Sequence, residues 1–527
     1  MAPIMTFWSA LGGVALLLLW LGRRLSSRRR FAGLPRVGID PGFLGLQMQA
    51  AKDEFFHHGQ QLLEHGYAKY KDTPYVTQTC DNERLVIPDR FIEELKNLPD
   101  TQISFKEELL ERFMGKYTKL DAVRGTTIHR DIVRFQLTKS LGNLLPQMKE
   151  EAQLALDNAL GGCNSKEFTP IKASSMVFAA IGQITSRRVI DDPQVSRDPV
   201  WLKTIMGFTT SLATFCITMR TISSTLRPIA RFTIPSGRKL RSDIAQVTMF
   251  LAPLIRKRQQ QQQQQNLNSA AGDQTQKEDG PPQDFVQWLA EAAQAQGGGR
   301  DTEPEAIVIK ILFLIVAAMH SSAVTAIHAV YDLCAHPETM RDLREEARAV
   351  LGAHGWTHSA LLRLHRMDSF LKEGGRANSA GIVSFQRLVL SPIRLSNGFV
   401  IPAGTHICAA SDARSRDPAL YEAPLEFRPL RFYHPLLREA ADGGGEVDAA
   451  NLFSSVANGD SWFGVGRQAC PGRWYASAQI KLVLCLLLTE YEFKFPDGQT
   501  ARPKNWVKDE KTGPDMEQMI WVRRLRG

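Results

Sequence analysis

The sequence predicts a mainly α-helical protein with small β-sheets, an α+β fold, over 527 residues. Apolar residues recur with the 3.6-residue period of a helix in residues 133–160 and again in residues 329–351. β-branched residues gather in residues 384–410, where Asn397-Gly398 is a typical hairpin dipeptide. Hydrophobic residues make up 43% of the chain and charged residues 23%, which indicates a folded body rather than a disordered chain.

The N-terminus predicts a membrane anchor. Residues 1–22 carry no charged side chain, and a helix of that length rises roughly 33 Å, enough for a bilayer core. Arginines follow at once, so we expect a single-pass helix in the endoplasmic-reticulum membrane with the body in the cytosol. A cleaved signal peptide is the alternative, but it would place basic residues before the apolar run. Residues 23–45, basic and with Pro35 and Pro41, are expected to be a linker.

Charge and cysteine content exclude two other classes of protein. The net charge is +9, but six arginines and no acid lie in residues 23–36, so the body carries only about +3. That is too little for a nucleic-acid footprint. The 7 cysteines are odd in number and form no CxxC pair, which argues against a disulfide framework or a zinc site.

Residues 46–527 show no internal repeat and contain one low-complexity stretch. The Gln-rich run between Lys257 and Gln283 cannot bury a core, so we expect an inserted, mobile surface loop within residues 257–300. A partner-binding role for the Gln run is the alternative.

A glycine-rich stretch, Phe463-x-x-Gly466-x-x-x-Cys470-x-Gly472, surrounds a single cysteine. A helical pattern begins just behind it, which places the sulfur near the positive end of a helix and its unpaired N–H groups. Both stabilise a thiolate. Such a thiolate is a metal ligand or a nucleophile, and a nucleophile would need a base, whereas the motif holds no histidine.

Two charged motifs and one apolar segment precede this loop. Glu373-x-x-Arg376 shares a helix face, and its simplest interpretation is a surface ion pair. Arg431 lies in the stretch "EFRPLRF". Residues 312–333 predict a long buried helix with His320, Ser321 and Ser322 at its middle. Polar groups at the centre of a buried helix are either satisfied locally or face a cavity.

The order, spacing and residue types of these motifs resemble the cytochrome P-450 family of haem-thiolate monooxygenases over essentially the whole chain. Residues 369–407 further resemble the fungal branch that oxidises terpenoids and other secondary metabolites. The resemblance implies the cytochrome P-450 fold behind the transmembrane helix, with residues 46–527 as the haem-thiolate catalytic domain.

The resemblance also implies roles for single residues. Cys470 would be the axial ligand of the iron of haem b, whose chemistry a thiolate ligand suits. Glu373, Arg376 and Arg431 would form a buried ion network that braces the cysteine loop. The other residues implied in haem binding are Phe463, Gly466, Arg467, Gln468, Gly472, Arg387 and Arg134. Those implied in catalysis are His320, Ser321 and Ser322.

Two positions depart from the family's pattern. Gln468 stands where the family often has an Arg or His that binds a haem propionate, so Arg387 and Arg134 are expected to supply that charge. His320-Ser321 replaces the usual acid–Thr pair. Serine keeps a hydroxyl that can relay protons but lacks the methyl group that fixes its rotamer. Ser322, turned about 100° away, can bond the carbonyl four residues back.

The resemblance implies a monooxygenase that inserts one oxygen atom of O2 into an apolar secondary metabolite, a terpenoid or meroterpenoid. Electrons would come from NADPH through the NADPH–cytochrome P-450 reductase, with cytochrome b5 as an optional further partner. Phe313, Val316 and Ala317 are expected in an apolar pocket. The alternative is a haem-thiolate isomerase or peroxygenase, or a haem-binding protein without turnover. The predicted anchor and the Ser321 hydroxyl favour the monooxygenase.

Overall fold

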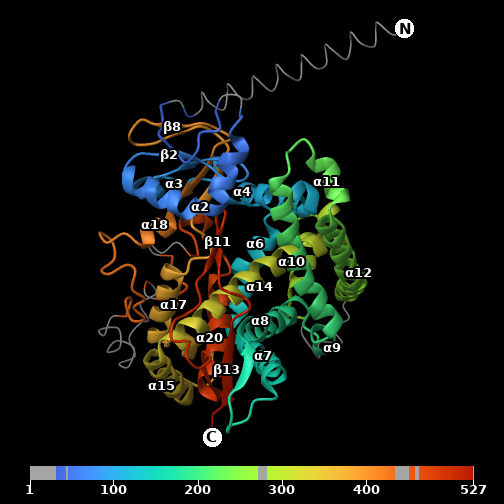
Figure 1. Cartoon of the computed structure of the whole chain (residues 1–527). Helices are drawn as coiled ribbons and strands as arrows, with labels where there is room; N and C mark the ends of the chain where they lie inside the picture. Colours follow the sequence, from blue (N-terminus) through green and yellow to red (C-terminus); the bar gives the residue numbers. More distant parts are fainter. Residues whose placement is uncertain are drawn as a thin grey trace. The chain divides into compact units, whose positions relative to one another are not determined.

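The computed structural model describes residues 31, 33–42, 45–270, 282–433, 450, 452–456 and 462–525. The predicted anchor at residues 1–22 and the first part of the predicted linker lie outside the described residues. The described chain is mainly helical with small sheets, which confirms the predicted fold class (Figure 1). It divides into two compact units, each described by itself.

The first unit comprises the chain up to residue 108 with residues 381–422 and 507–511. Its six-stranded sheet has the order β1-β2-β3-β9-β6-β4, parallel at β1/β2 and β3/β9 and antiparallel elsewhere. Phe55 and Leu63 of helix α2 pack into one apolar cluster with Tyr75 and Val86 of the sheet. Its elements are β1 (Arg36–Val37), α2 (Met48–Lys69), β2 (Tyr75–Gln78), β3 (Glu83–Val86), η1 (Asp89–Phe91), α3 (Ile92–Leu95), β4 (Ile103–Ser104), α4 (Phe105–Arg112), β6 (Ser384–Val389), β7 (Ile393–Arg394), β8 (Val400–Ile401), β9 (His406–Ala409) and α18 (Ser411–Ser415).

The hairpin predicted at Asn397-Gly398 is confirmed. Strands β7 and β8 pair antiparallel on either side of it. Gly398 has a φ of +85°, a left-handed conformation that glycine adopts without strain.

The second unit contains most of the helices. Helix α14 packs against α8, α12 and α20 (Figure 1). The core of this unit is a large cluster of buried apolar side chains. Its elements are α5 (Gly115–Thr118), η2 (Leu120–Val123), α6 (Ile128–Ile132), η3 (Val133–Leu137), α7 (Thr138–Leu160), β5 (Thr169–Lys172), α8 (Ala173–Val189), α9 (Pro193–Ser196), α10 (Pro199–Thr221), α11 (Arg227–Thr233), α12 (Pro235–Ala270), α13 (Phe285–Ala295), η4 (Gly299–Thr302), α14 (Pro304–Ala335), α15 (Pro337–His354), α16 (His358–Leu362), α17 (His365–Ala377), η5 (Gly466–Gln468), α20 (Arg473–Glu490), β10 (Tyr491–Lys494) and β13 (Met519–Arg524).

Three short sheets complete the structure. Strands β10, β13 and β5 form an antiparallel sheet, and β11 (Trp506–Lys508) pairs with β12 (Lys511–Gly513). The third is the β7/β8 hairpin.

The helical patterns at residues 133–160 and 329–351 are confirmed, with one irregularity in each. The first pattern begins with a π-helical turn, η3, and continues as the α-helix α7. The second splits at His336, because Pro337 occupies the first turn of α15, where proline is tolerated. Helices α10 and α14 are both long and apolar enough to cross a membrane, but 67% of the most apolar window of α14 is buried, as in a core helix.

The structure differs from the loop expected at residues 257–300. Helix α12 continues through the Gln run to Ala270, because glutamine and alanine are good helix formers. Residues 285–295 form helix α13, whose Phe285, Trp288 and Leu289 are buried. Asp284 caps that helix by accepting the N–H of Gln287 at 2.8 Å. Residues 271–281 lie outside the described part of the chain.

Candidate active site

The cysteine loop folds back on itself in front of helix α20. Gly464 and Gly466 have φ values of 69° and 66°, which only glycine adopts without strain. The N–H of Cys470 donates to the carbonyl of Phe463 at 2.8 Å and closes the loop. Cys470 is partly exposed and lies three residues before the first residue of α20, Arg473.

Burial and neighbouring groups act in opposite directions on the pKa of the Cys470 thiol, and the net shift is upward. Burial raises the pKa of the Cys470 thiol, whereas the N–H of Gly472 and the positive charge of Arg473 lower it. By contrast, burial raises the pKa of Cys485, in the middle of α20, to about 12. Of these two cysteines, Cys470 has the donors that favour a thiolate, as the sequence predicts for a metal ligand.

Two cations lie beside this loop. The Arg473 side chain donates to the carbonyl of Cys470 at 3.0 Å, while its buried Nε has no hydrogen-bond partner among the described residues. Burial and the nearby charge of Arg134 lower the pKa of Arg473. Arg134 lies in η3, next to Val133, whose side chain a Cβ added at Gly472 would meet at 3.4 Å. Neighbouring cations with an unpaired buried donor fit an anionic ligand, so this end of the loop suits the propionates of haem b.

The predicted charged triad is brought together, with Glu373 and Arg376 buried and Arg431 partly buried. Both oxygens of Glu373 accept from Arg376, at 2.7 and 2.8 Å, and Oε2 also accepts from Arg431 at 2.9 Å. Glu373 is fully buried, so the interpretation of the ExxR motif as a surface ion pair is wrong. Both arginines also donate to the carbonyl of Glu426. The network thereby fixes the segment 423–431 to helix α17.

A tryptophan connects helix α17 to the cysteine loop. Trp462 precedes Phe463, and its ring lies so close to Gly375 that a Cβ there would meet it at 3.0 Å. The same ring stacks on Phe453, with 15° between the planes, and its Nε1 donates to the Phe453 carbonyl at 3.3 Å. Gly375 therefore leaves room for the Trp462 ring. This packing explains why a glycine stands inside helix α17 although glycine lowers helix stability.

Helix α14 is open along one face at its middle. Ala317, His320 and Ser321 are exposed and Phe313 and Val316 partly so, whereas the other faces of the helix are buried. We call these five residues the open face of α14. Because they recur at helical spacing on a core helix, they border solvent-accessible space inside the second unit. The ring of His320 lies 5.9 Å from that of Phe178 of α8.

The two serines of α14 have different surroundings from those expected. The Ser321 hydroxyl donates to the carbonyl of Ala317 at 3.0 Å, the bond expected for Ser322. The Ser322 hydroxyl is buried and has no partner among the described residues. Ser321 thus has a fixed hydroxyl on the open face, and Ser322 points into the core.

The remaining predicted residues lie in two places. Gly466, Arg467 and Gln468 form the turn η5, in which Arg467 is exposed and Gln468 partly buried. Phe463 makes an edge contact with Phe453 at 5.1 Å. Arg387 is on β6 of the first unit, where burial lowers its pKa to about 10. Its guanidinium donates to the Gln386 carbonyl at 2.8 Å, and its role in haem binding stays a prediction.

Sequence reasoning missed Arg473 and Trp462. Arg473 stands at the first position of the helix after the cysteine, where a cation is unfavourable for the helix dipole, and that anomaly is a usable signal. No local pattern pairs Trp462 with Gly375, because the contact joins segments far apart in the sequence.

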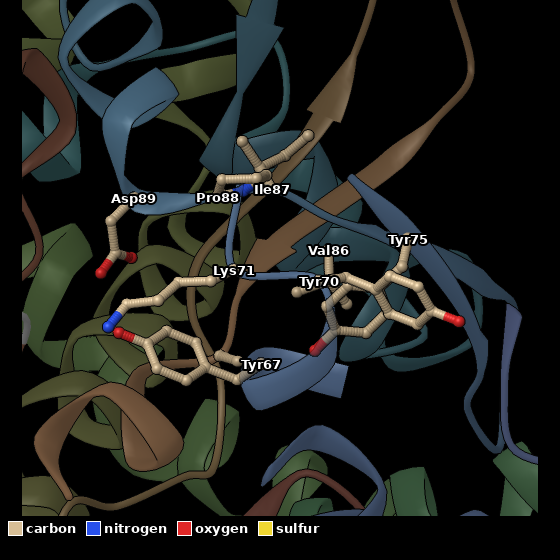
Figure 2. Close-up of a pocket in the computed structure, with 9 residues that line it drawn as sticks. Tyr67, Tyr70, Lys71, Tyr75, Val86, Ile87, Pro88 and Asp89 are labelled. Carbon is tan, nitrogen blue, oxygen red and sulfur yellow. The ribbon is translucent and has the colours of Figure 1, made fainter. Parts of the chain in front are cut away.

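A small hollow in the first unit is excluded as a substrate site. Figure 2 shows Tyr67, Tyr70 and Tyr75 with Lys71 and Asp89 around it. Its volume is about 10 Å³, room for at most one water. Tyr67 and Lys71 are both bonded to Asp417, so their polar atoms are already satisfied.

Comparison with known proteins gives a uniform result. The profile of the cytochrome P-450 family matches residues 101–511. The chain is 31% identical to the ent-kaurene oxidase of Fusarium fujikuroi, over 89% of this chain and 84% of that protein. It is 30% identical to the cytochrome P-450 monooxygenase paxP of Penicillium paxilli, over 89% of this chain and 86% of that protein. It is also 30% identical to the cytochrome P-450 monooxygenase janP of Penicillium janthinellum, over 88% of this chain and 85% of that protein.

Proposed function

Because this chain belongs to the cytochrome P-450 family of monooxygenases, we propose that it inserts one oxygen atom of O2 into an apolar, polycyclic terpenoid. Electrons come from NADPH through a membrane-bound flavoprotein reductase, the partner that the family generally uses. The observation that carries the proposal is the presentation of Cys470 at the start of α20, in the unit that also contains the open face of α14.

The substrate class is supported by the relatives and by the lining. Relatives at 31% identity are named ent-kaurene oxidases. On the open face, Phe313, Val316 and Ala317 offer only hydrocarbon surface. Such a lining favours a large apolar skeleton, and the polar atoms at its end, on His320 and Ser321, can orient it.

The chain's residues divide the work of the reaction. When bound, haem b supplies oxygen activation and accepts electrons. Cys470 binds it as a thiolate, which the Gly472 N–H and the Arg473 charge stabilise. Arg134 and Arg473 neutralise its acidic side chains. Ser321, with its hydroxyl held by the Ala317 carbonyl, passes protons along the open face, and the apolar lining excludes water from the substrate.

The proposal includes an anchor in the endoplasmic-reticulum membrane. Residues 5–22 form the apolar stretch, and the arginines that follow keep the catalytic domain in the cytosol. An apolar terpenoid partitions into the same membrane, so anchoring places the enzyme where its substrate is concentrated.

Expression with a reductase in microsomes tests the function. With NADPH, 18O2 and candidate diterpenoid and meroterpenoid skeletons, we expect a product that carries one 18O atom and depends on both NADPH and O2. Hydrogen peroxide that supports oxidation where NADPH and O2 do not would instead indicate a peroxygenase. If neither NADPH with O2 nor hydrogen peroxide gives a product, the result would contradict both the monooxygenase and the peroxygenase.

A further inference from the structure

A line of polar side chains runs along the otherwise apolar C-terminal half of helix α14. Ser321, Thr325, His328 and Asp332 follow one another at spacings of four, three and four residues. At 100° per residue they lie within one narrow sector of the helix surface. We call these four residues the polar stripe, and it spans roughly 16 Å from the open face to the end of the helix.

The two ends of the polar stripe differ in access. Ser321 is exposed on the open face and Thr325 is partly buried. His328 is 3% exposed and Asp332 fully buried. Asp332 nevertheless pairs with Arg502, whose side chain is 22% exposed, so the far end reaches the surface of the second unit.

A hydrogen-bond network fixes the buried end. Arg502 donates to Asp332, to Nδ1 of His328 at 2.9 Å and to Asn505 at 3.0 Å. Asn378 donates to the second oxygen of Asp332 at 3.1 Å. Both carboxylate oxygens are therefore held in place.

The same bonds assign the tautomer of His328. A guanidinium can only donate, so Nδ1 of His328 must accept and its proton must sit on Nε2. Burial and the charge of Arg502 lower the pKa of His328 to about 3, so the ring is neutral. Its Nε2–H is buried and has no partner among the described residues. A buried donor of this kind usually binds an ordered water.

Asp332 can hold a proton near neutral pH. Burial raises its pKa to about 6, against the opposing charge of Arg502. The titratable groups that face it are Arg502, His328, His336 and Glu373. Of these, Glu373 raises the pKa of Asp332 further, while His336 lowers it.

We propose that the polar stripe conducts protons from solvent at Arg502 to the open face of α14. Asp332 donates the proton, and a water bound to the Nε2–H of His328 carries it towards Thr325. Thr325 and Ser321 then pass it on by rotating their hydroxyls away from the carbonyls of Ser321 and Ala317, to which they donate at 3.0 Å in the structure. The inference rests on the proposed function, in which each turnover consumes O2, two electrons and two protons and yields the oxidised substrate and one water. Asp332 recovers its proton from solvent, so no further reactant is needed.

A purely structural role would use the same residues only to hold the C-terminal segment on α14. Tyr331 provides the matched control for that role, because its hydroxyl binds the carbonyl of Asp515 at 2.6 Å and joins the same elements outside the polar stripe. Thr325→Val removes one hydroxyl without touching the ion pair, and it stays informative if Asp332→Asn does not fold.

The activity test compares two oxidants on one substrate. Asp332→Asn and Thr325→Val should lower NADPH- and O2-driven product formation by about tenfold or more. Oxidation driven by hydrogen peroxide, which brings its own protons, should stay within about twofold in both. The NADPH-driven rate of the wild type should fall as the pH rises above about 6, and the rate of Asp332→Asn should not show this fall. Equal losses with both oxidants, or losses no larger than those of Tyr331→Phe, would overturn the proposal.

A second readout needs no turnover. In purified full-length protein, the infrared C=O band of a protonated carboxyl should titrate near pH 6, vanish in Asp332→Asn, remain in Tyr331→Phe, and shift on transfer to D2O. A band that is absent, or that does not respond to D2O, would show that solvent protons do not reach Asp332. If the band behaves as expected while no substrate is oxidised, the proposed function fails and proton access to Asp332 stands.

Discussion

At the scale of single residues, two cysteines near one helix differ by their surroundings. Cys470 has a backbone N–H donor and Arg473 beside its sulfur, whereas Cys485 is fully buried among leucines and has only the charge of Lys481 to oppose its burial. Cys470→Ala should abolish the red-shifted absorption band of the reduced carbon monoxide complex, because only thiolate ligation produces it. Cys485→Ala should keep the band. An unchanged band in Cys470→Ala would remove the ligand assignment.

The hydroxyl of Ser321 supports a second prediction. Ser321→Ala should uncouple the reaction, with NADPH consumed and peroxide released in place of product, and should slow the proton-dependent step by about 10²–10⁴-fold. Ser321→Thr should keep coupling, because it retains the hydroxyl that binds the Ala317 carbonyl. The measurement is the ratio of product formed to NADPH oxidised. A ratio in Ser321→Ala equal to that of the wild type would contradict the relay.

The site residues were predictable to different degrees. Cys470 and its glycines are contiguous, so one short stretch reveals them. Glu373 and Arg376 share a helix turn, and the family resemblance added Arg431 to their network, whereas the motif alone indicated a surface ion pair. The structure joins all three and buries Glu373 and Arg376. The bond to the carbonyl four residues back, which the sequence offers for Ser322, is made by Ser321, because adjacent serines on a helix differ only in which neighbour they face.

At the scale of elements, the contact between Gly375 and Trp462 joins helix α17 to the cysteine loop. Gly375→Ala should displace the ring and weaken haem binding, with a falling ratio of bound haem to protein. Gly142→Ala is the control, because that residue also lies inside a helix but has no atom within 4 Å of the added Cβ. The control should raise stability by up to about 1 kcal/mol. Equal haem content in both variants would exclude the role of the contact.

A buried ion cluster in the first unit predicts that the folding stability depends on pH. Burial raises the pKa of Glu108, but Arg84 at 2.7 Å and His406 at 2.6 Å lower it to about 2, from an ordinary value of 4.5. The folded state therefore binds this proton less readily than the unfolded state. The stabilisation, about 3 kcal/mol, is present above pH 4.5 and is lost as the pH falls towards 2.

Urea unfolding of Glu108→Gln against the wild type measures this effect. The difference in unfolding free energy should be large at pH 7 and should shrink as the pH falls from 4.5 towards 2. Glu517→Gln is the control, since its partner is Lys172 and its side chain is 79% exposed, so the difference should stay under about 1 kcal/mol. A difference in unfolding free energy between Glu108→Gln and the wild type that does not change with pH would show that protonation of Glu108 does not affect stability.

Element types were predicted where periodicity is long, but the helices within residues 257–300 were missed. The Gln run has no apolar face, so pattern alone indicates a loop, yet residues 257–270 continue helix α12. The Leu251 and Ile255 side chains anchor the preceding turns in the core, and the helix then propagates at little cost through residues of high propensity. Such propagation depends on tertiary packing upstream, which no local window contains.

At the scale of the whole molecule, the described residues contain both apolar clusters, so the catalytic domain should fold without residues 1–30. The described part also exposes large apolar side chains near the end of α10 and along α11. They are Ile217, Leu226, Ile229 and Phe232, each at least half exposed. Arg227 and Arg231 lie among them. Apolar and basic side chains together suit the surface of an anionic membrane.

The last prediction separates this surface from the proposed anchor. Full-length protein in microsomes should stay in the pellet after alkaline carbonate washing, because a spanning helix resists extraction. Protein without residues 1–30 should bind haem, bind anionic vesicles and be released by carbonate or high salt. Changing Ile217, Leu226, Ile229 and Phe232 to serine in the truncated protein should abolish vesicle binding and leave the haem spectrum intact. Release of the full-length protein by carbonate would contradict the predicted anchor. A truncated protein that does not bind anionic vesicles would contradict a membrane contact through the α10–α11 surface.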